Sequence, residues 1–301
     1  MWKYYCFRII GPTLSLLPMK IGYLIAYLVA DTVYMLSPGL RSAIADNMRH
    51  VLEPDVDDAT LRRTVRGVLR HAAKNYFDLI KIPRLKLDDI LNRITVHGWD
   101  NYEEALNRGK GVIIVTAHLG SFDMTAQLLA ARAAKTTVLV EVQEPPALLD
   151  YVTNLRKSKG LTLLPVQPGA LRIIMQSLHR GETVGLVCDR DIGKDGLKTN
   201  FFGEQTTLPV GPVRIAMRTG APIIPAYNLR RKGSSYEVYL EPALDISNDG
   251  EDAVRQNMRR LIEALEKSIR TCPQQWVVLG PIWENGYRER CAAKSQCLVP
   301  S

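Results

Sequence analysis

Hydrophobic and polar positions follow two different rhythms along the chain, and the rhythm changes near Asn92. Beyond that point, short uncharged runs rich in β-branched residues are separated by stretches with helical spacing. Such runs are typical of strands that are buried on both faces of a parallel sheet. We predict strands at 111–117, 136–142, 161–165, 183–188, 222–228 and 235–241, and helices at 122–134, 148–159, 169–180 and 252–270. This alternation predicts an α/β fold with a mostly parallel central sheet flanked by helices.

The first 36 residues are mostly apolar, but Arg8, Lys20 and Asp31 interrupt them. The uncharged runs at 9–19 and 21–30 are shorter than the roughly 20 residues that a membrane-spanning helix needs. We therefore expect an N-terminal helical segment that lies in or on one leaflet of a membrane. A buried helical hairpin and a cleaved signal peptide are the two alternatives.

A long helix is predicted to begin near Asp57 and Asp58, which can cap its first turn. Apolar residues recur at helical spacing from Leu61 to Phe77. The opposite side carries basic residues at intervals of four, namely Arg62, Arg66, Arg70 and Lys74. Such a stripe is either a solvated face or a contact with anionic headgroups, where each basic residue contributes about 1 kcal/mol near the surface.

The net charge of +8 and the pI near 9.2 favour an anionic partner. Phospholipid and a phosphorylated cofactor remain open, whereas nucleic acid is disfavoured because the chain contains no recognised nucleic-acid-binding motif. The five cysteines form no CxxC pair and no zinc-type cluster: Cys6, Cys188, Cys272, Cys291 and Cys297. We expect a reducing, cytosolic setting and no metal site.

The predicted strand at 111–117 runs directly into His118, and Asp123 follows five residues later. Ligands of parallel α/β sheets bind beyond the carboxyl ends of the strands, so His118 is well placed to touch a substrate. A turn at Gly120 would put Asp123 in the first turn of the next helix, where its carboxylate can accept a hydrogen bond from the imidazole. We predict that His118 is a general base and that Asp123 orients it. The base would then activate a substrate hydroxyl or amine.

Two alternatives to this reading remain. Ser121 does not lie in the G-x-S-x-G turn of hydrolases, but Cys188 ends another predicted strand and could meet His118 and Asp189 as a cysteine-dependent acyl or thioester hydrolase. A cysteine in such a strand is usually a small core residue. A catalytically silent lipid-binding protein is the second alternative.

Further motifs accompany the H-x4-D sequence. They are HLGSFD at 118–123, CDRD at 188–191, FFG at 201–203, LPVGP at 208–212 and RTGAPIIP at 218–225. With them the chain resembles bacterial lysophospholipid-acyltransferase-like enzymes, in the branch that contains the lipid A lauroyl/myristoyl acyltransferases and the phosphatidylinositol mannoside acyltransferase. The resemblance covers nearly the whole chain.

The resemblance implies a glycerol-3-phosphate acyltransferase-like fold and an O-acyltransferase. An acyl chain would pass from acyl-CoA or acyl carrier protein to a hydroxyl of a membrane glycolipid or phospholipid. We expect this transfer to be direct, without a cofactor or an acyl-enzyme. It implies that His118 is the base, that Asp123 orients it, and that Asp189 matches an acidic residue that contacts the histidine. The lipid A branch commonly has glutamate at the position of Asp123 and D-Q-D at 189–191, where this chain has D-R-D, and both differences lean toward the mannoside branch.

The resemblance also places Glu141 and Arg156 near the reacting carbonyl. Arg190 and Asp191 follow a predicted strand at the edge where His118 lies, and we include them as substrate-binding residues. Arg218 joins them, on a helix whose start at 211–212 could receive a phosphate or an oxyanion. We expect the backbone amides after His118 to stabilise the oxyanion of the reaction.

We expect three regions: an N-terminal helical, membrane-associated region over 1–92, an α/β acyltransferase domain over 93–284 and a polar tail over 285–301. The resemblance implies a peripheral or monotopic protein on the cytoplasmic face of the bacterial plasma (inner) membrane. Its partners would be the acyl donor, a glycolipid acceptor and an anionic membrane surface, and no nucleic acid.

Overall fold

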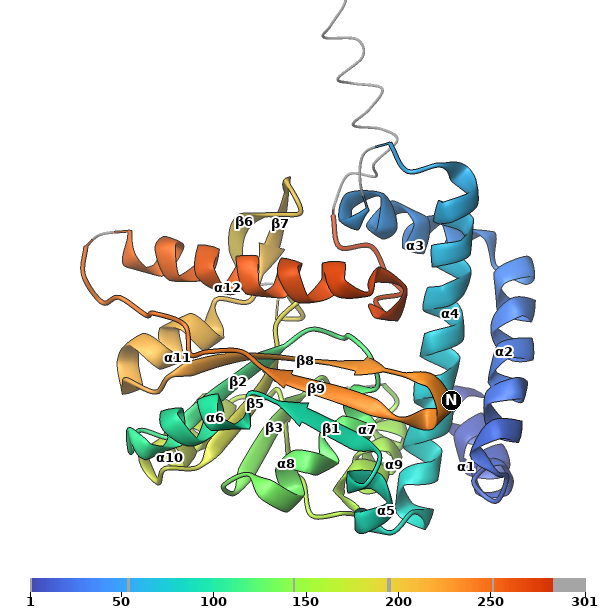
Figure 1. Cartoon of the computed structure of the whole chain (residues 1–301), viewed down its shortest axis with the longest axis horizontal. Coiled ribbons are helices and arrows are strands. Elements are labelled where there is room, and N and C mark those ends of the chain that lie inside the picture. Colours follow the sequence, from blue (N-terminus) through green and yellow to red (C-terminus); the bar gives the residue numbers. More distant parts are fainter. Residues whose placement is uncertain (1, 53–54, 143, 194–195, 251, 284–301) are drawn as a thin grey trace, which may run out of the picture.

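A seven-stranded sheet forms the centre of the molecule, in the order β1-β9-β8-β2-β5-β3-β4 (Figure 1). The computed structural model describes residues 2–52, 55–142, 144–193, 196–250 and 252–283. The sheet strands are β1 (Ile94–His97), β2 (Val112–Thr116), β3 (Thr136–Val140), β4 (Thr162–Pro165), β5 (Thr183–Val187), β8 (Ile223–Arg230) and β9 (Tyr236–Leu240). Strands β8, β2, β5, β3 and β4 are parallel, whereas β9 is antiparallel to β8 and β1 is parallel to β9. The predicted α/β fold with a mostly parallel sheet is confirmed.

The sequence pattern predicts six of these strands and misses β1 and a separate hairpin. The hairpin consists of β6 (Leu197–Phe201) and β7 (Glu204–Leu208). β1 and the first four residues of β6 alternate between half-buried and exposed positions and carry polar residues. Such segments lack the continuous apolar run that marks a central strand, so their pattern alone does not separate them from loops.

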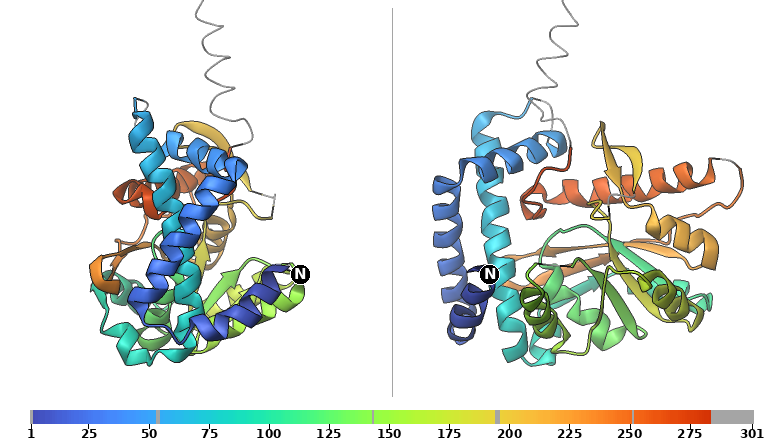
Figure 2. Two further views of the ribbon diagram at one scale, coloured as in Figure 1. Left: turned by 90° about the vertical axis from the view of Figure 1, so that its right-hand side faces the viewer. Right: turned by 180° about the vertical axis from the view of Figure 1, so that it is seen from behind.

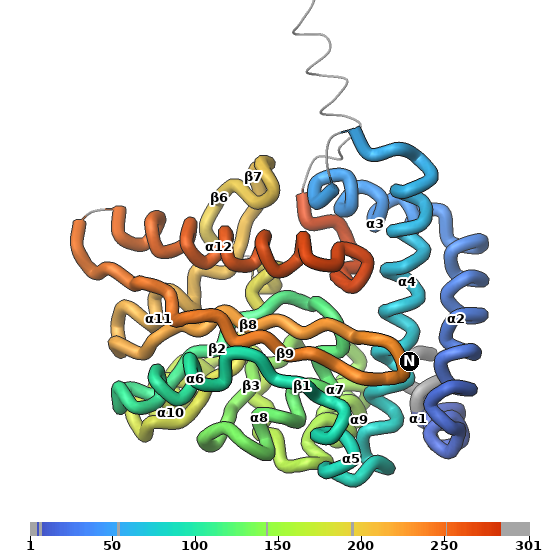
Figure 3. Tube along the Cα trace, in the orientation of Figure 1, coloured from blue at the N-terminus to red at the C-terminus, as the bar shows by residue number. Residues whose placement is uncertain are grey.

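Helices cover both faces of the sheet (Figures 1 and 3). Ile113 and Val115 of β2 share one core cluster with residues of α10, α11 and α12, and Val112 and Ile114 share another with α6 and α8. The helices of this part are α5 (Leu87–Leu91), α6 (Trp99–Asn107), α7 (Phe122–Thr125), α8 (Gln127–Arg132), α9 (Pro146–Lys157), α10 (Ala170–His179), α11 (Gly211–Thr219) and α12 (Ala253–Thr271). Short 3-10 turns lie at η1 (Ile82–Arg84), η2 (Lys232–Ser234) and η3 (Pro273–Gln275).

Four N-terminal helices stand beside the carboxyl edge of the parallel strands (Figure 1). They are α1 (Trp2–Leu14), α2 (Met19–Leu36), α3 (Pro38–Val51) and α4 (Asp58–Lys81). Asp57 caps α4 as predicted, because its Oδ1 accepts from the amides of Ala59 and Thr60 at 2.8 and 2.9 Å. Residues of α2, α3 and α4 share the largest core cluster with the sheet, so these three helices are packed against the sheet as part of one core. The predicted polar tail over 285–301 lies outside the described residues.

The basic stripe of α4 faces α2. Arg70 makes two hydrogen bonds to Asp31 at 2.9 and 2.6 Å, and Arg66 lies 3.4 Å from the same carboxylate. Lys74 is 8% exposed and lies over the rings of two α2 tyrosines. The expected solvated or headgroup-facing stripe is therefore wrong for the buried Lys74. Arg66 and Arg70 pair with Asp31 of α2 and keep 41% and 36% of their side-chain surface exposed.

Helices α1 and α2 lie on the outside of the molecule (Figure 2, left). Large hydrophobic residues of α1, of α2 and of the turn between them are between 48% and 76% exposed, which gives this part of the molecule an apolar outer side: Ile9, Ile10, Leu16, Ile21, Leu24, Leu28, Val29, Met35 and Leu36. By length and composition alone, α2 is long enough and apolar enough to cross a membrane. Signal sequences and the buried core helices of soluble proteins also meet these two criteria. A fully buried hairpin does not fit this exposure, whereas a helix that contacts lipid does.

Candidate active site

His118 and Asp189 meet at the carboxyl edge of the sheet. His118 follows β2 and Asp189 follows β5, and these two strands pair in parallel up to Thr116 and Val187. The His118 Nδ1 lies 2.8 Å from Asp189 Oδ1, and the His118 backbone N–H donates to Asp189 Oδ2 at 2.9 Å. One carboxylate therefore holds both the ring and the backbone of the histidine.

The Asp189 carboxylate is fully buried and well satisfied. Trp276 Nε1 donates to Oδ2 at 2.7 Å. Burial by itself raises the pKa of Asp189, but the adjacent imidazole and the N–H donors lower that pKa by more, and the net shift is downward. An ionised Asp189 favours the proton on Nδ1 of His118, which leaves Nε2 to act as a base. In the described part of the chain no group hydrogen-bonds to Nε2, and the His118 side chain is 22% exposed.

Asp123 lies in the first turn of α7, as predicted, but its carboxylate is turned toward Arg156 of α9. Arg156 Nε donates to Oδ1 at 2.6 Å and Nη2 donates to Oδ2 at 3.3 Å. The expected hydrogen bond between Asp123 and His118 is absent from the described contacts, and Asp189 takes that position. The reason is that both α7 and α9 pack on α4, which brings Asp123 and Arg156 together beside the site.

Three other predicted residues lie in the loops that follow β3 and β5. Arg190 Nη1 lies 3.9 Å from Glu141 Oε2, and both side chains are about 40% exposed. Asp191 Oδ2 accepts from the Gly196 amide at 3.0 Å and so shapes its own loop. Glu141 and Arg190 are thus accessible at the edge that carries His118, whereas Asp191 has a structural contact.

Arg218 lies at the other edge of the sheet. It occupies the last turn of α11, which leads into β8, and Ile223 at the start of β8 pairs with Ile113 near the start of β2. His118 lies beyond the far end of β2, roughly 16 Å away at about 3.3 Å per strand residue. The structure does not bring Arg218 to His118.

The four amides from His118 to Ser121 are already occupied. Their acceptors are Asp189 Oδ2, Ala117 O, Gln275 O and Asn228 Oδ1, at 2.9, 2.7, 3.0 and 2.7 Å. The expectation that these amides stabilise an oxyanion is therefore wrong for this arrangement. Arg156 remains a candidate donor, since no described residue accepts from its Nη1.

The turn after His118 requires glycine. Gly120 has φ +70°, and a Cβ added there would lie 2.1 Å from the carbonyl oxygen of Asn228. Both the left-handed backbone and the close approach exclude a side chain. The predicted turn at Gly120 is confirmed.

Neither candidate protein nucleophile is available. Ser121 is 1% exposed, and its Oγ donates to Asp78 Oδ2 at 2.6 Å. Cys188 is 2% exposed, and burial, followed by the charge of Asp189, raises the pKa of its thiol well above the ordinary value. A cysteine hydrolase centred on Cys188 does not fit this burial. Cys291 and Cys297 lie outside the described residues.

The profile of a family described as bacterial lipid A biosynthesis acyltransferases matches residues 1–285. The chain belongs to this acyltransferase family. The predicted resemblance is confirmed.

Named relatives of the chain come from both branches of the predicted resemblance. The chain is 30% identical over 214 residues to a phosphatidylinositol mannoside acyltransferase of Mycobacterium tuberculosis, a match that covers 70% of this chain and 66% of the relative, just under two thirds. A protein of the same name from Mycolicibacterium smegmatis is 26% identical over 222 residues, covering 73% of this chain and 72% of the relative. A lipid A biosynthesis acyltransferase of Haemophilus influenzae is 24% identical over 183 residues, covering 60% and 56%.

The sequence pattern does not predict the residues that hold His118 and its loop in place in this acyltransferase-family chain. Trp276 contacts Asp189 from far along the chain, and no local spacing points to that contact. Asn75 and Asp78 had a usable signal, because they are polar residues on the apolar face of α4 and are buried. Buried polar groups need hydrogen-bond partners, so their presence there indicates a polar cluster.

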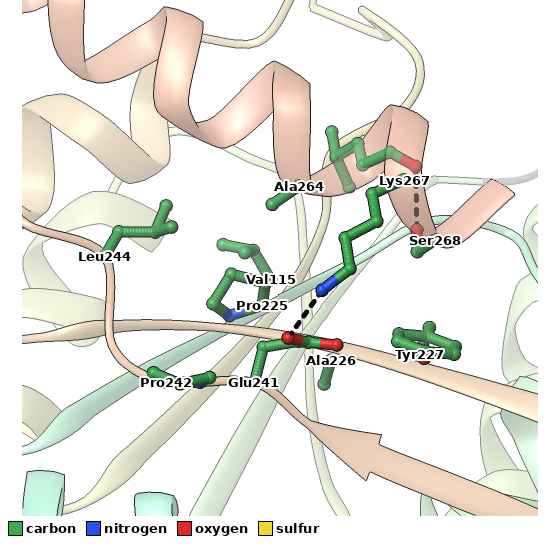
Figure 4. A pocket seen from close by; sticks show the side chains of 11 residues that line it. Val115, Pro225, Ala226, Tyr227, Glu241, Pro242, Leu244, Ala264, Lys267 and Ser268 are labelled. Atoms are coloured by element: carbon green, nitrogen blue, oxygen red, sulfur yellow. Dashed lines mark hydrogen bonds and ion pairs between the residues drawn. The ribbon is translucent and has the colours of Figure 1, made fainter. Parts of the chain in front are cut away.

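Two cavities lined by described residues lie away from His118. One, of about 130 Å³, lies between α12 and strands β8 and β9, and the ion pair between Lys267 and Glu241 at 3.0 Å borders it (Figure 4). The other, of about 450 Å³, lies between α12 and the β6–β7 hairpin. In the described part of the chain, no three His, Cys, Asp or Glu side chains are arranged to hold a metal ion.

Proposed function

We propose that this protein is a membrane-associated O-acyltransferase. It moves a fatty acyl chain from acyl-CoA or acyl carrier protein to a hydroxyl of a glycolipid or phospholipid, and a phosphatidylinositol mannoside-type glycolipid is the favoured acceptor. The observation that carries the proposal is the His118–Asp189 pair at the carboxyl edge, with Nε2 left without a described partner. The family and the names of the relatives support the same reaction.

The reaction is a direct transfer. Nε2 of His118 removes the proton of the acceptor hydroxyl while the oxygen attacks the thioester carbonyl, and the tetrahedral intermediate then expels the thiolate. The proton held on Nε2 passes to the leaving sulfur, so the base is restored. The buried Asp189 carboxylate stabilises the imidazolium, and base catalysis of this kind typically contributes about 10²- to 10⁴-fold. The burial of Ser121 and Cys188 supports a reaction without an acyl-enzyme.

Arg156 is proposed to stabilise the oxyanion. Asp123 holds its guanidinium through Nε and Nη2, and Nη1 is left for the developing charge. Loss of one oxyanion donor typically lowers the rate by about 10²- to 10³-fold. Glu141 and Arg190, the exposed pair beside the site, are proposed to contact the polar part of a substrate.

The lipid substrates would reach His118 from the bilayer. The apolar side of α1 and α2 supports membrane association. Val142, Val166 and Ile192 follow β3, β4 and β5 and are 45%, 42% and 39% exposed, so apolar side chains also line the edge at which His118 lies. We place the protein as a peripheral or monotopic protein on the cytoplasmic face of the bacterial plasma membrane, in keeping with its basic charge.

The test is lipid mass spectrometry. Purified wild type, His118→Ala and the control His179→Ala are incubated with palmitoyl-CoA or palmitoyl-acyl carrier protein and total polar lipid of the host membrane. His179 is a suitable control because it is an exposed histidine on α10. We expect one lipid to gain one palmitoyl mass with wild type and His179→Ala and not with His118→Ala. Release of free palmitate alone would indicate a hydrolase, and no reaction with either donor would overturn the proposed function.

A further inference from the structure

A buried polar cluster connects the N-terminal helices to the loop that carries His118. We call it the Asp78 cluster, and its members are Tyr23, Asn75, Asp78, Ser121, Arg230 and Tyr236. They come from α2, α4, the loop before α7, β8 and β9. Five of the six are at most 7% exposed, and Tyr23 is partly buried.

Asp78 lies at the centre of the cluster. Its Oδ1 accepts from the Tyr23 hydroxyl at 2.8 Å. Its Oδ2 accepts from Ser121 Oγ at 2.6 Å and from Arg230 Nη2 at 2.7 Å. Arg230 Nη1 also donates to the Tyr23 hydroxyl at 2.6 Å, so α2, α4 and β8 are joined through one ion pair.

Asn75 extends the cluster to the next residue of the loop. Its Nδ2 donates to the Gly120 carbonyl at 2.7 Å, and its Oδ1 accepts from Arg230 Nη2 at 2.7 Å. The cluster therefore holds Gly120 through a hydrogen bond to its carbonyl and Ser121 through a hydrogen bond from its hydroxyl. These are the second and third residues after His118.

The same short loop is held on its other side by backbone contacts. Gly120 N donates to Gln275 O at 3.0 Å, and Val277 N donates to His118 O at 2.8 Å. The loop thus has fixed partners on both sides. In enzymes generally, displacing a reacting group by about 1 Å can cost about 10²-fold in rate, so such fixation matters for catalysis.

Stability alone is a weak explanation for the buried ion pair. Asp78 and Arg230 have side chains that are 0% and 3% exposed. Removing two charges from water carries a large desolvation cost, and well-packed apolar residues in place of such a pair are often at least as stable. A pair of apolar residues at these positions would lose the hydrogen bonds that connect Asp78 and Arg230 to the loop, through Ser121 and Asn75.

Tyr23 is the member of the cluster that belongs to α2. Its ring points toward α4, while its neighbours Ile21 and Leu24 are 48% and 59% exposed on the outer apolar side. Burial and the charge of Asp78 raise the pKa of the Tyr23 hydroxyl far above its ordinary value, so it stays a neutral donor. A shift of α2 relative to α4 would therefore disturb the hydrogen bond between Tyr23 and Asp78.

We propose that Tyr23, Asp78 and Arg230 are positioning residues, which fix the His118 loop and make the apolar helix α2 part of the catalytic unit. This inference rests on the proposed function for its kinetic test. None of the three residues touches the reacting atoms. Each acts through Gly120 and Ser121.

The test compares Tyr23→Phe with Tyr27→Phe. Tyr27 lies one turn further along α2, and its ring stacks under Arg70 and Lys74, with no described hydrogen bond from its hydroxyl. We expect Tyr23→Phe to lower kcat about threefold to tenfold, the effect of one lost hydrogen bond. The KM for the acyl donor and the binding to vesicles of the polar-lipid mixture should stay unchanged. Tyr27→Phe should keep kcat within about twofold of wild type.

Hydrogen–deuterium exchange gives a second measurement that does not need turnover. Peptides that contain the amides of 119–121 should exchange faster in Tyr23→Phe than in wild type, and at the wild-type rate in Tyr27→Phe. If no lipid product forms but this difference appears, the proposed function fails and the positioning inference stands. Unchanged exchange and unchanged kcat in Tyr23→Phe, or equal losses in the two variants, would overturn the inference.

A double-mutant cycle tests whether the contacts act along one path. We expect Tyr23→Phe and Ser121→Ala together to lower kcat by less than the product of the two single losses, because both weaken the hold of Asp78 on the loop. Losses that multiply would show independent roles and contradict the inference. The cycle avoids Asp78→Asn, which would leave Arg230 buried without its counter-charge and threaten folding.

Discussion

The carboxylate of Asp189 holds His118 at two points, the ring Nδ1 at 2.8 Å and the backbone N–H at 2.9 Å. A single side chain therefore sets both the tautomer of the ring and the position of the residue that carries it. Trp276 holds the second carboxylate oxygen in place. These contacts make Asp189 the strongest candidate for the partner of the base.

We expect Asp189→Asn to lower kcat by about 10²- to 10⁴-fold, because an amide can neither stabilise the imidazolium nor enforce the Nδ1–H tautomer. The measurement is kcat at saturating palmitoyl-CoA, with the melting temperature as a check on folding. Asp245→Asn, at an exposed carboxylate paired with Arg260, is the control and should leave kcat within about twofold. A loss below about tenfold in a folded Asp189→Asn protein would contradict the assignment.

Asp123→Asn should be less damaging than Asp189→Asn. Asp123 contacts Arg156, so its loss disturbs the oxyanion donor and leaves the Nδ1 contact of His118 in place. We expect kcat to fall by about 10- to 10²-fold, and Arg156→Lys to give a loss of similar size because an ammonium cannot reproduce the two parallel hydrogen bonds. Parallel kcat measurements on the three variants decide the order. If Asp123→Asn were the more severe change, Asp123 would be the partner of the base after all.

The strand pattern is enough to place His118 and Asp189 at one edge of the sheet, since each follows an uncharged run that is typical of a strand in a parallel sheet. That the two strands are neighbours comes from the structure. The spacing of Asp123 correctly predicts its place in the first turn of a helix. It does not predict where the carboxylate points, because that depends on how α7 and α9 pack on α4. The counter-charge for the basic stripe of α4 is hidden for a similar reason, since Asp31 belongs to another helix. The periodicity of the sequence predicts helices and strands, but it does not predict contacts between segments that are far apart in the chain.

Cys188→Ala should remain active. The thiol is buried at the end of β5, and no described contact directs it toward a substrate. We expect kcat within about twofold of wild type and a loss of stability of about 1 kcal/mol for the small cavity. Complete loss of activity in a folded variant, or a trapped acyl-cysteine in wild type, would restore the hydrolase alternative.

His71 should make the protein sensitive to acid. Burial, helped by the positive charges of Lys74 and Arg230, lowers the pKa of His71 from 6.5 to about 3. Between these values the unfolded chain binds a proton that the folded chain does not, so stability is lost as pH falls below about 6.5. His71 alone changes the free energy of unfolding by up to about 1.4 kcal/mol per pH unit in this range. Urea unfolding in mild detergent at pH 7, 5.5 and 4.5 should show a shallower acid slope for His71→Gln and an unchanged slope for the exposed control His179→Gln.

The exposed residues of α2 should control membrane affinity. Leu24 and Leu28 are 59% and 63% exposed, so replacing them leaves the core intact. Burying a leucine side chain is worth about 1.5 to 3 kcal/mol, and we expect the double change to asparagine to weaken vesicle binding by at least about tenfold, with the double change to alanine in between. Vesicle flotation measures this series. Equal binding by all three proteins would mean that this side of α2 does not meet lipid.

The short antiparallel contact between Leu119 and Trp276 has a consequence for biosynthesis. The segment that steadies His118 is the one that follows α12, so the catalytic loop lacks its backbone partners until translation has passed Val277. While the ribosome is still making the sheet and α12, the apolar N-terminal helices are already available to bind lipid. A nascent chain can therefore expose its apolar helices to the membrane before the loop after His118 has gained its backbone partners at Gln275 and Val277.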